Sequence, residues 1–103
     1  MSRVALTDGS GKWFSEETAE YFKEDTYFNG SNWISKATGK QSFHEGLYHT
    51  KGGKYILREF TDYAGGRDEY KIIDAYAAAA WFSINEMEPH DKCEKEFNDL
   101  EIE

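Results

Sequence analysis

The sequence has 103 residues, the length of one domain, and a domain of this size can hold one modest hydrophobic core. Phe, Tyr and Trp make up 17% of the residues, which excludes a disordered chain because these side chains supply large buried areas. The formal net charge of −8 argues against direct binding of DNA or RNA, because such binding needs clustered Lys and Arg.

The cellular compartment is predicted from cysteine content and from the N-terminal sequence. Cys93 is the single cysteine, and the opening residues MSRVALTDGSGKWF lack the apolar segment of a signal peptide. No apolar run approaches the roughly 18 residues that a membrane span requires. We therefore expect a cytoplasmic protein that does not enter a membrane.

The N-terminal quarter is predicted to form a strand and a helix. Residues 3–7 resemble a short strand, and the following DGSG is a turn that leads into either a hairpin or a simple bend. Ser15 is a suitable N-cap for a short amphipathic helix from Glu16 to Glu24, with Ala19 and Phe22 on its inner side.

The central part of the chain is typical of antiparallel strands. The segment TYFNGSNWI has aromatic and β-branched residues on both sides of Asn-Gly, which predicts a tight turn. The runs SFHEGLYHT, KYILREFTDY and DEYKII are separated by glycine turns and predict a meander. Counting by twos places Phe43, Leu47, Ile56 and Phe60 on one face, and His44, Tyr48, Tyr55, Leu57 and Tyr63 on the other. Both faces carry enough apolar side chains that another element is expected to pack on each of them.

Two helices are expected at the C-terminal end. Asp74 is a suitable N-cap for the helix AYAAAAWFSIN, which is apolar nearly all round and should be buried on more than one side. Its residues at helical spacing are Ala77, Ala80, Trp81 and Ile84. The segment HDKCEKEFNDL predicts a last helix. The expected fold is one α+β domain over residues 1–103, with a meander of three to five strands, a short N-terminal helix and two C-terminal helices.

The segments TGKQSFHEGLYHTKGGKYIL and AAAAWFSINE resemble a group of small uncharacterised proteins of bacteria and their mobile elements. A Thr-Gly-x-Gln segment, a strand with His-Glu and Leu-Tyr, and an Ala-Ala-x-Trp helix recur in that group. The resemblance covers about residues 36–90, and this chain departs from it at Phe43, where Trp is expected, and at Ala77 and Ala78, where an acid is expected. It implies a mobile-element context and transfers no catalytic residues.

The stretch HEGLYH suggests a metal hydrolase, but its spacing does not fit one. His44 and His49 are five residues apart in a predicted strand, so their rings should point to opposite faces of the sheet. His90 and Cys93 lie three residues apart in the last predicted helix, and no third ligand is evident near them in sequence. We expect no metal and no cofactor. A small enzyme using His44, Glu45 and Tyr48 remains an alternative.

The acidic side chains are the leading candidates for binding a partner. In the predicted N-terminal helix Glu16, Glu20 and Glu24 fall on one line, with a spacing of roughly 6 Å that approaches the roughly 7 Å step between phosphates. Residues 86–103 hold eight acidic and two basic side chains. The candidate partner-binding residues are Glu16, Glu20, Glu24, Glu94, Glu96 and Asp99, and the secondary candidates are Tyr27, Phe28, Trp33 and Tyr48.

These features favour a non-catalytic acidic protein that occupies a basic, nucleic-acid-binding surface of another protein. Combined with the mobile-element context, the hypothesis is an inhibitor of the anti-CRISPR or antirestriction type. Solubility alone would also account for the acidic surface. A further alternative is a structural homodimer or larger homo-oligomer whose interface is the Ala-Trp helix.

Overall fold

The computed structural model describes residues 3–102, and its strands are antiparallel. In chain order its elements are β1 (Arg3–Ala5), β2 (Trp13–Ser15), the 3-10 helix η1 (Glu16–Thr18), β3 (Glu20–Lys23), β4 (Thr26–Phe28), β5 (Trp33–Ser35), β6 (Phe43–His49), β7 (Tyr55–Thr61), β8 (Glu69–Ile73), α1 (Ala75–Ile84), the 3-10 helix η2 (Asp91–Cys93) and α2 (Glu94–Asp99). The α+β class and the two C-terminal helices are as expected. The described residues form eight strands, however, where three to five were expected.

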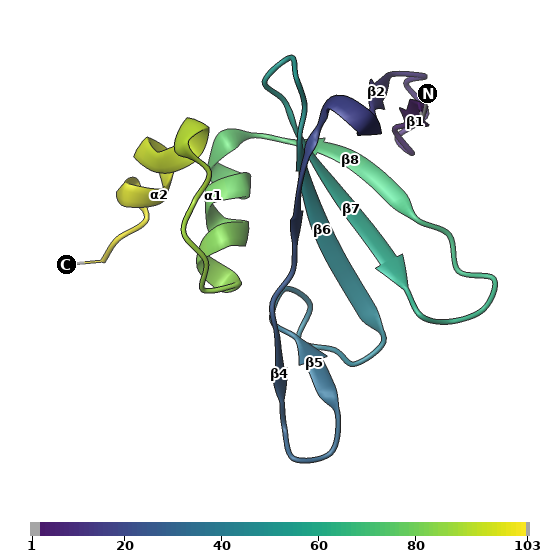
Figure 1. Cartoon of the computed structure of the whole chain (residues 1–103), viewed down its shortest axis with the longest axis vertical. Coiled ribbons are helices and arrows are strands. Elements are labelled where there is room, and N and C mark those ends of the chain that lie inside the picture. The colour runs from purple at the N-terminus through teal and green to yellow at the C-terminus, as the bar shows by residue number, and fades with distance from the viewer. Residues whose placement is uncertain (1–2, 103) are drawn as a thin grey trace.

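A four-stranded sheet in the order β3-β6-β7-β8 forms the centre of the molecule (Figure 1). Strands β6, β7 and β8 are the predicted meander. The β6–β7 turn is closed by a hydrogen bond from the Thr50 N–H to the Lys54 carbonyl, and Gly53 supplies a φ of 89°. Two separate hairpins, β1–β2 and β4–β5, complete the strands.

The predicted helix over residues 16–24 is wrong. Only a single 3-10 turn forms at Glu16–Thr18, and the chain then becomes the edge strand β3. There Tyr21 pairs with Tyr48 and Phe22 pairs with Leu47, so the two adjacent aromatic rings point to opposite faces of the sheet. A helix would place both rings on neighbouring sides of one cylinder. Strand pairing with β6 lets Phe22 pack against the core beneath α1 and Tyr21 pack against the ring of Tyr48, and this outweighs the helix propensity of the segment.

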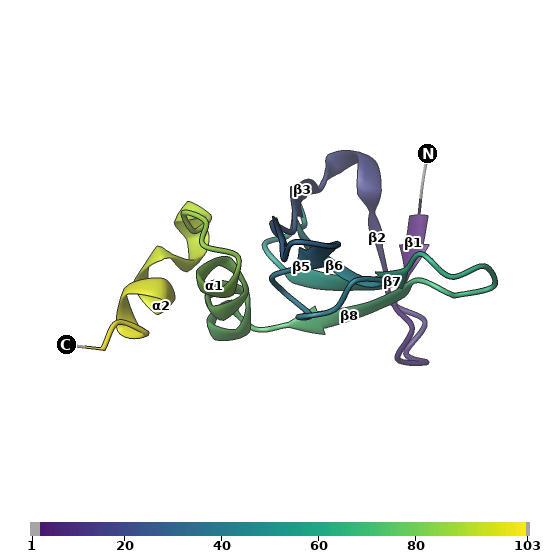
Figure 2. The same cartoon turned by 90° about the horizontal axis from the view of Figure 1, so that it is seen from below.

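Helix α1 covers one face of the central sheet (Figure 2). Leu47, Tyr55 and Leu57 from the sheet pack against α1 in a cluster that includes the fully buried Phe82. The rings of Phe22 and Phe82 meet edge to face with centroids 5.0 Å apart. This is the larger of the two cores.

The N-terminal hairpin β1–β2 packs on the opposite face. Leu6 and Phe14 from the hairpin form a second buried cluster with Tyr48 and Ile56 from the sheet. The expectation that both faces of the sheet are covered is therefore confirmed, by a helix on one side and a hairpin on the other.

The predicted grouping of residues on the two faces is wrong by one position in β7. Leu47 pairs with Leu57 rather than sharing a face with Ile56, and Tyr48 pairs with Ile56. The turn between the strands sets this register, and a shift of one residue exchanges the two faces of a strand. Phe60 accordingly lies beside His44, on the hairpin side.

Helix α1 begins where predicted, because the Asp74 side chain accepts a 2.8 Å hydrogen bond from the Ala77 N–H. Its buried residues are Ala78, Ala79, Trp81 and Phe82. Of the residues noted at helical spacing, Trp81 is buried, whereas Ala77 and Ile84 are exposed. An all-round apolar helix gives no periodic signal for its orientation.

The last predicted helix, over residues 90–100, is shorter in the structure. It consists of η2 followed by the six-residue α2, with Cys93 buried against α1 and Phe97 half-buried. Among the described residues, no helix has the length and apolar character needed to cross a membrane.

Candidate functional site

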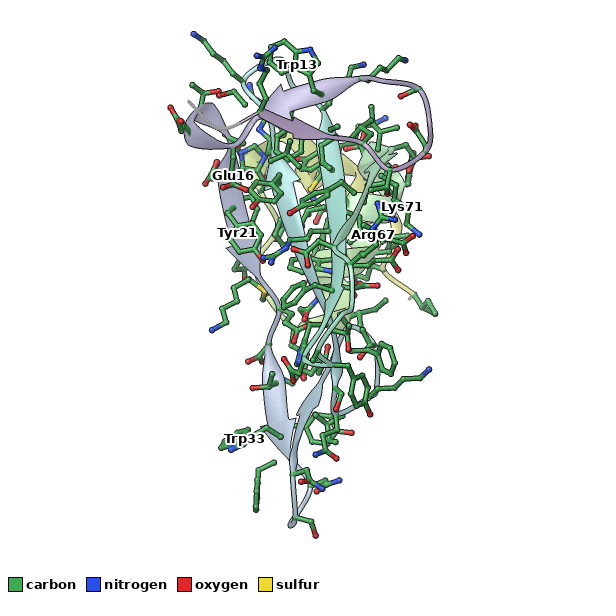
Figure 3. All side chains as sticks on the ribbon, turned by 90° about the vertical axis from the view of Figure 1, so that its right-hand side faces the viewer. Trp13, Glu16, Tyr21, Trp33, Arg67 and Lys71 are labelled. Carbon is green, nitrogen blue, oxygen red and sulfur yellow. The ribbon has the colours of Figure 1, made fainter. Side chains whose placement is uncertain are left out.

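The β4–β5 hairpin projects beyond one end of the central sheet (Figure 1). We call residues 26–35 the arm. Tyr27, Phe28 and Trp33 on the arm are 46%, 54% and 64% exposed, although aromatic side chains of this size are usually at least half-buried. Trp33 lies at the end of the molecule opposite Trp13 (Figure 3). The sequence proposed these three residues as secondary candidates, and the structure places all three on one exposed hairpin.

Strand pairing sets the direction of the aromatic rings. Phe28 pairs with Trp33 across the hairpin, and their ring centroids are 5.3 Å apart at an angle of 56°. Tyr27 pairs with Ile34 and therefore belongs to the other face of the arm. The arm presents an aromatic pair on one face and a single tyrosine on the other.

The tip of the arm is held in shape by one side chain. Asn29 Oδ1 accepts 2.9 Å hydrogen bonds from the N–H groups of both Ser31 and Asn32. Gly30 takes a φ of 102°, which is accessible to glycine at little steric cost. The predicted tight turn at Asn-Gly is confirmed, and it presents the aromatic rings on an ordered loop.

The base of the arm is tied to the C-terminal end of α1. The Asp25 N–H donates a 2.9 Å hydrogen bond to Oδ1 of the fully buried Asn85. Lys36 bridges two carboxylates, Asp25 at 2.8 Å and Glu86 at 2.5 Å. Glu86 has a φ of 55°, a left-handed conformation that costs a non-glycine residue roughly 1–2 kcal/mol. These contacts fix the arm relative to the main core.

A buried carboxylate lies behind the arm. Glu24 is 8% exposed and accepts hydrogen bonds from Ser35 Oγ at 2.7 Å and from the Glu45 N–H at 2.6 Å. Its second oxygen lies 2.7 Å from Nδ1 of His44, whose Nε2 lies 2.8 Å from Asp62. Burial disfavours the charged imidazolium, but the hydrogen bonds to Asp62 and Glu24 outweigh this effect and raise the pKa of His44. The network is a satisfied ion cluster.

The structure does not bring the residues of the enzyme alternative into one site. His44 has both ring nitrogens occupied by carboxylates, so neither is free to take a proton from a substrate. Glu45 faces the opposite side of the sheet, toward α1. Tyr48 is 5% exposed, and burial together with its hydrogen bond to Glu16 raises the pKa of its hydroxyl. Its burial also makes Tyr48 unsuitable as a surface contact for a partner.

The three glutamates predicted to form one stripe are separated, because the helix that would align them is not formed. Glu16 accepts a 3.0 Å hydrogen bond from Tyr48, Glu20 lies 3.3 Å from Nε2 of His90, and Glu24 is buried. The phosphate-like spacing inferred from the sequence therefore does not exist. The acids on α2 remain at the surface, with Glu94 and Asp99 exposed and Glu96 half-buried.

The structure also changes which residues of α1 could mediate self-association. Trp81 is 5% exposed, and α1 packs against α2 within the chain. Tyr76, Ala77 and Ile84 are the exposed apolar residues of α1, and the Tyr76 hydroxyl donates a 3.0 Å hydrogen bond to Asp99. A homodimer through α1 remains a prediction, and its interface would contain these three residues rather than Trp81.

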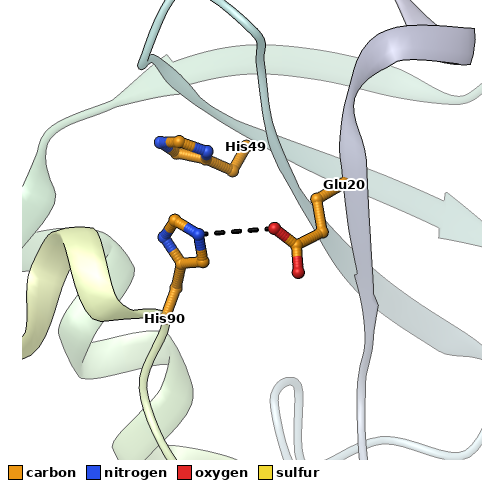
Figure 4. Close-up of side chains that lie close together, drawn as sticks. All are labelled: Glu20, His49 and His90. Carbon is orange, nitrogen blue, oxygen red and sulfur yellow. Dashed lines mark ion pairs between the residues drawn. The ribbon is translucent and has the colours of Figure 1, made fainter.

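Three potential metal ligands meet at one end of the sheet (Figure 4). A carboxylate oxygen of Glu20 and ring nitrogens of His49 and His90 all lie within 4.8 Å of one another. Burial and the neighbouring His90 lower the pKa of His49. The expected separation of His44 from His49 onto opposite faces is confirmed, but the expectation that His90 has no further ligands near it is wrong. The three residues come from distant parts of the chain, and no spacing in the sequence signals their meeting.

Comparison of the chain with protein families, with curated proteins and with solved structures finds no match.

Proposed function

We propose that the protein is a non-catalytic binding module that docks on another protein through the arm. The observation that carries the proposal is the exposure of Tyr27, Phe28 and Trp33 on an ordered, projecting hairpin. Large aromatic side chains are rarely left in solvent together. Their most frequent role on a surface is to fill pockets of a partner.

The energetics of association support this use of the arm. A large aromatic side chain buries roughly 150–250 Å² when it is covered, and Trp and Tyr are the residues most enriched among interface hot spots. The ordered turn at Asn29 and the tie between Asp25 and Asn85 mean that little chain entropy is lost when a partner binds.

Charge distribution supports a basic partner. Residues 26–35 contain no charged side chain, whereas the whole chain has a formal net charge of −8. The complementary surface would therefore hold an apolar pocket for the arm, surrounded by Lys and Arg that meet the acidic remainder of the molecule.

A surface with that combination is typical of proteins that bind nucleic acids, whose basic grooves often contain aromatic or apolar walls. The proposal therefore retains an inhibitor that competes with nucleic acid, as expected from composition and from the mobile-element resemblance. Its contact residues are now the aromatic ones of the arm, because the glutamate stripe is not formed.

The test is capture of a partner by photo-crosslinking from the arm. A photoreactive phenylalanine analogue placed at Tyr27 should crosslink one specific protein, and the same analogue at Tyr63 should not, although Tyr63 is also exposed. The double substitution Phe28→Ala, Trp33→Ala should abolish capture. Trp13→Ala is the matched control, because Trp13 is 55% exposed but lies outside the arm.

The captured protein should be basic, and its binding of nucleic acid should decrease when this protein is added. Equal capture by wild-type protein and by the double variant would exclude the arm as the docking surface. Capture of an acidic protein that binds no nucleic acid would retain the arm but exclude the inhibitor role.

A further inference from the structure

We infer that Glu20, His49 and His90 form a binding site for a divalent transition-metal ion of the zinc type. This site is separate from the arm and does not depend on the proposed function. The inference rests on the placement of the three side chains, on their ligand chemistry and on the hydrogen bond that orients His90.

The register of the sheet brings two of the ligands side by side. Glu20 of β3 pairs with His49 of β6, which in turn pairs with Tyr55 of β7, so the three side chains form a row across one end of the face that α1 covers. His90, which precedes η2, lies over this row. Its ring centroid is 4.3 Å from that of His49 and 5.6 Å from that of Phe22.

The distances suit a small ion with short bonds. Zinc is bound by His nitrogen and carboxylate oxygen at about 2.0–2.2 Å, so two ligand atoms of a tetrahedral site are about 3.4 Å apart. Nε2 of His90 and Oε1 of Glu20 are already 3.3 Å apart (Figure 4). The remaining pairs lie within 4.8 Å, and side-chain rotation of His49 and the exposed Glu20 can close that difference.

The ligand set itself favours a transition metal over Mg²⁺ or Ca²⁺. Two imidazoles and one carboxylate form a set typical of zinc sites that leave a fourth position open, whereas Mg²⁺ and Ca²⁺ prefer oxygen ligands. Asp91 Oδ1 lies 3.2 Å from Nε2 of His90, so a second carboxylate stands next to the three proposed ligands.

Contacts on the far side of the ring orient His90, so that Nε2 faces Glu20. The Tyr55 hydroxyl lies 2.9 Å from Nδ1. The Lys92 N–H donates a long, 3.4 Å hydrogen bond to the same nitrogen, so Nδ1 acts as an acceptor when no ion is bound. Ion binding at Nε2 requires the other tautomer, in which Nδ1–H donates to the Tyr55 oxygen and Nε2 faces the cluster with its lone pair, the kind of orienting contact that metal-bound histidines nearly always have. In the absence of an ion, a proton on Nε2 takes its place between His90 and Glu20.

His49 provides the second observation that points to a ligand. Within residues 3–102 its imidazole contacts the rings of Tyr55 and His90 but makes no hydrogen bond or ion pair. A half-buried imidazole beside a second imidazole and a carboxylate gains a polar partner when a cation binds between them.

An ion at this position would join parts of the chain that are distant in sequence. Glu20 lies in the edge strand, His49 at the end of a central strand, and His90 in the connection between α1 and α2. Binding would therefore fasten the C-terminal segment to the sheet, and it would stabilise the folded state because the unfolded chain does not hold the three ligands together.

The test is titration of the chelator-treated 103-residue chain with ZnCl₂ at neutral pH. Calorimetry should show saturable binding of one ion per chain, and the melting temperature should rise with zinc concentration. Glu20→Gln, His49→Gln and His90→Gln should each abolish the saturable binding. Tyr55→Phe, which keeps all three ligands, should weaken it by roughly tenfold or more.

Two variants serve as matched controls. His44→Gln makes the same change at the histidine on the opposite face of the sheet, and Glu69→Gln alters an exposed glutamate of β8. Both should bind zinc as the wild-type protein does. Circular dichroism establishes that each variant is folded.

A measurement on the wild-type protein tests the inference even if the variants fail to fold. Wild-type protein loaded with Co²⁺ should show the intense visible absorption of a tetrahedral site, which surface-bound hydrated Co²⁺ lacks. Absence of one-to-one zinc binding by the wild-type protein would overturn the inference. Binding that survives in His49→Gln and His90→Gln would also overturn it, because the ion would then be held elsewhere.

Discussion

The backbone N–H of Asp25 donates a 2.9 Å hydrogen bond to Oδ1 of Asn85, a residue 60 positions further along the chain. Asn85 is fully buried, and its amide nitrogen donates a 2.8 Å hydrogen bond to the carbonyl of Trp81. One side chain at the end of α1 thus satisfies a backbone group at the start of the arm. Asn85 therefore links helix α1 to the arm.

Substitution of Asn85 should therefore affect both stability and the arm. Asn85→Ala leaves the Asp25 N–H without its acceptor and removes a buried amide, which should reduce the free energy of unfolding by about 1–3 kcal/mol. Urea titration measures this loss. Asn98→Ala, at an exposed position of α2, is the control and should change stability by less than about 0.5 kcal/mol. Equal losses in the two variants would show that the hydrogen bond between Asp25 and Asn85 contributes no more to stability than an exposed side chain does.

Glycine at position 86 should be tolerated or favoured. After α1 the Met87 N–H bonds to the Phe82 carbonyl and the Glu86 N–H to the Ser83 carbonyl, an arrangement that usually has glycine at the left-handed position. Glu86→Gly should relieve roughly 1 kcal/mol of backbone strain and lose one ion pair, between the exposed Glu86 and the half-buried Lys36. Denaturant titration should show unchanged or higher stability. A loss above about 1 kcal/mol would mean that the Lys36 bridge is a major contact.

Stability should depend on pH through His44. Its pKa is raised in the folded state, so protonation of His44 favours folding. This contribution is fully present below the unfolded pKa of about 6.5 and is lost as the pH rises through the raised folded value. Unfolding free energies measured across that range, with chelator present, should fall with pH in the wild-type protein. The decrease should be smaller in His44→Gln, and an identical pH profile would exclude His44 as its source.

The meander, the Asn-Gly turn and the Asp74 cap were predictable because each depends on residues close together in sequence. Strand β3 was not, because its conformation is set by pairing with β6, about 25 residues away. The arm's aromatic residues could be named from the sequence, but their exposure depends on how the hairpin leaves the sheet. The cluster of Glu20, His49 and His90 gives no local pattern at all, since only the register of β3 with β6 and the position of η2 bring it together.

The register also changes which aromatic substitutions should be most damaging. The alternation of side chains along the strands predicted that Phe60 shares a face with Leu47, but Phe60 is only partly buried and packs beside His44 and Arg58, whereas Phe82 is fully buried. Phe82→Ala should cost about 3–5 kcal/mol, and Phe60→Ala clearly less. Chemical denaturation of the two variants decides between the two assignments. A larger loss for Phe60→Ala would contradict the observed register.

Once a partner is captured, the arm and the acidic surface should affect different steps of binding. Trp33→Ala should mainly speed dissociation, because aromatic anchors contribute short-range contacts that exist only in the complex. Charge reversal at Glu94, Glu96 and Asp99 should mainly slow association, because surface charges on α2 attract a basic partner at long range, before contact is made. Stopped-flow or surface-based kinetics separates the two rates. Salt should reproduce the second effect and not the first, since screening over about 8 Å at physiological ionic strength weakens attraction before contact. If Trp33→Ala instead left dissociation unchanged while charge reversal accelerated it, the acidic helix would be the docking surface, and the arm would have no part in recognition.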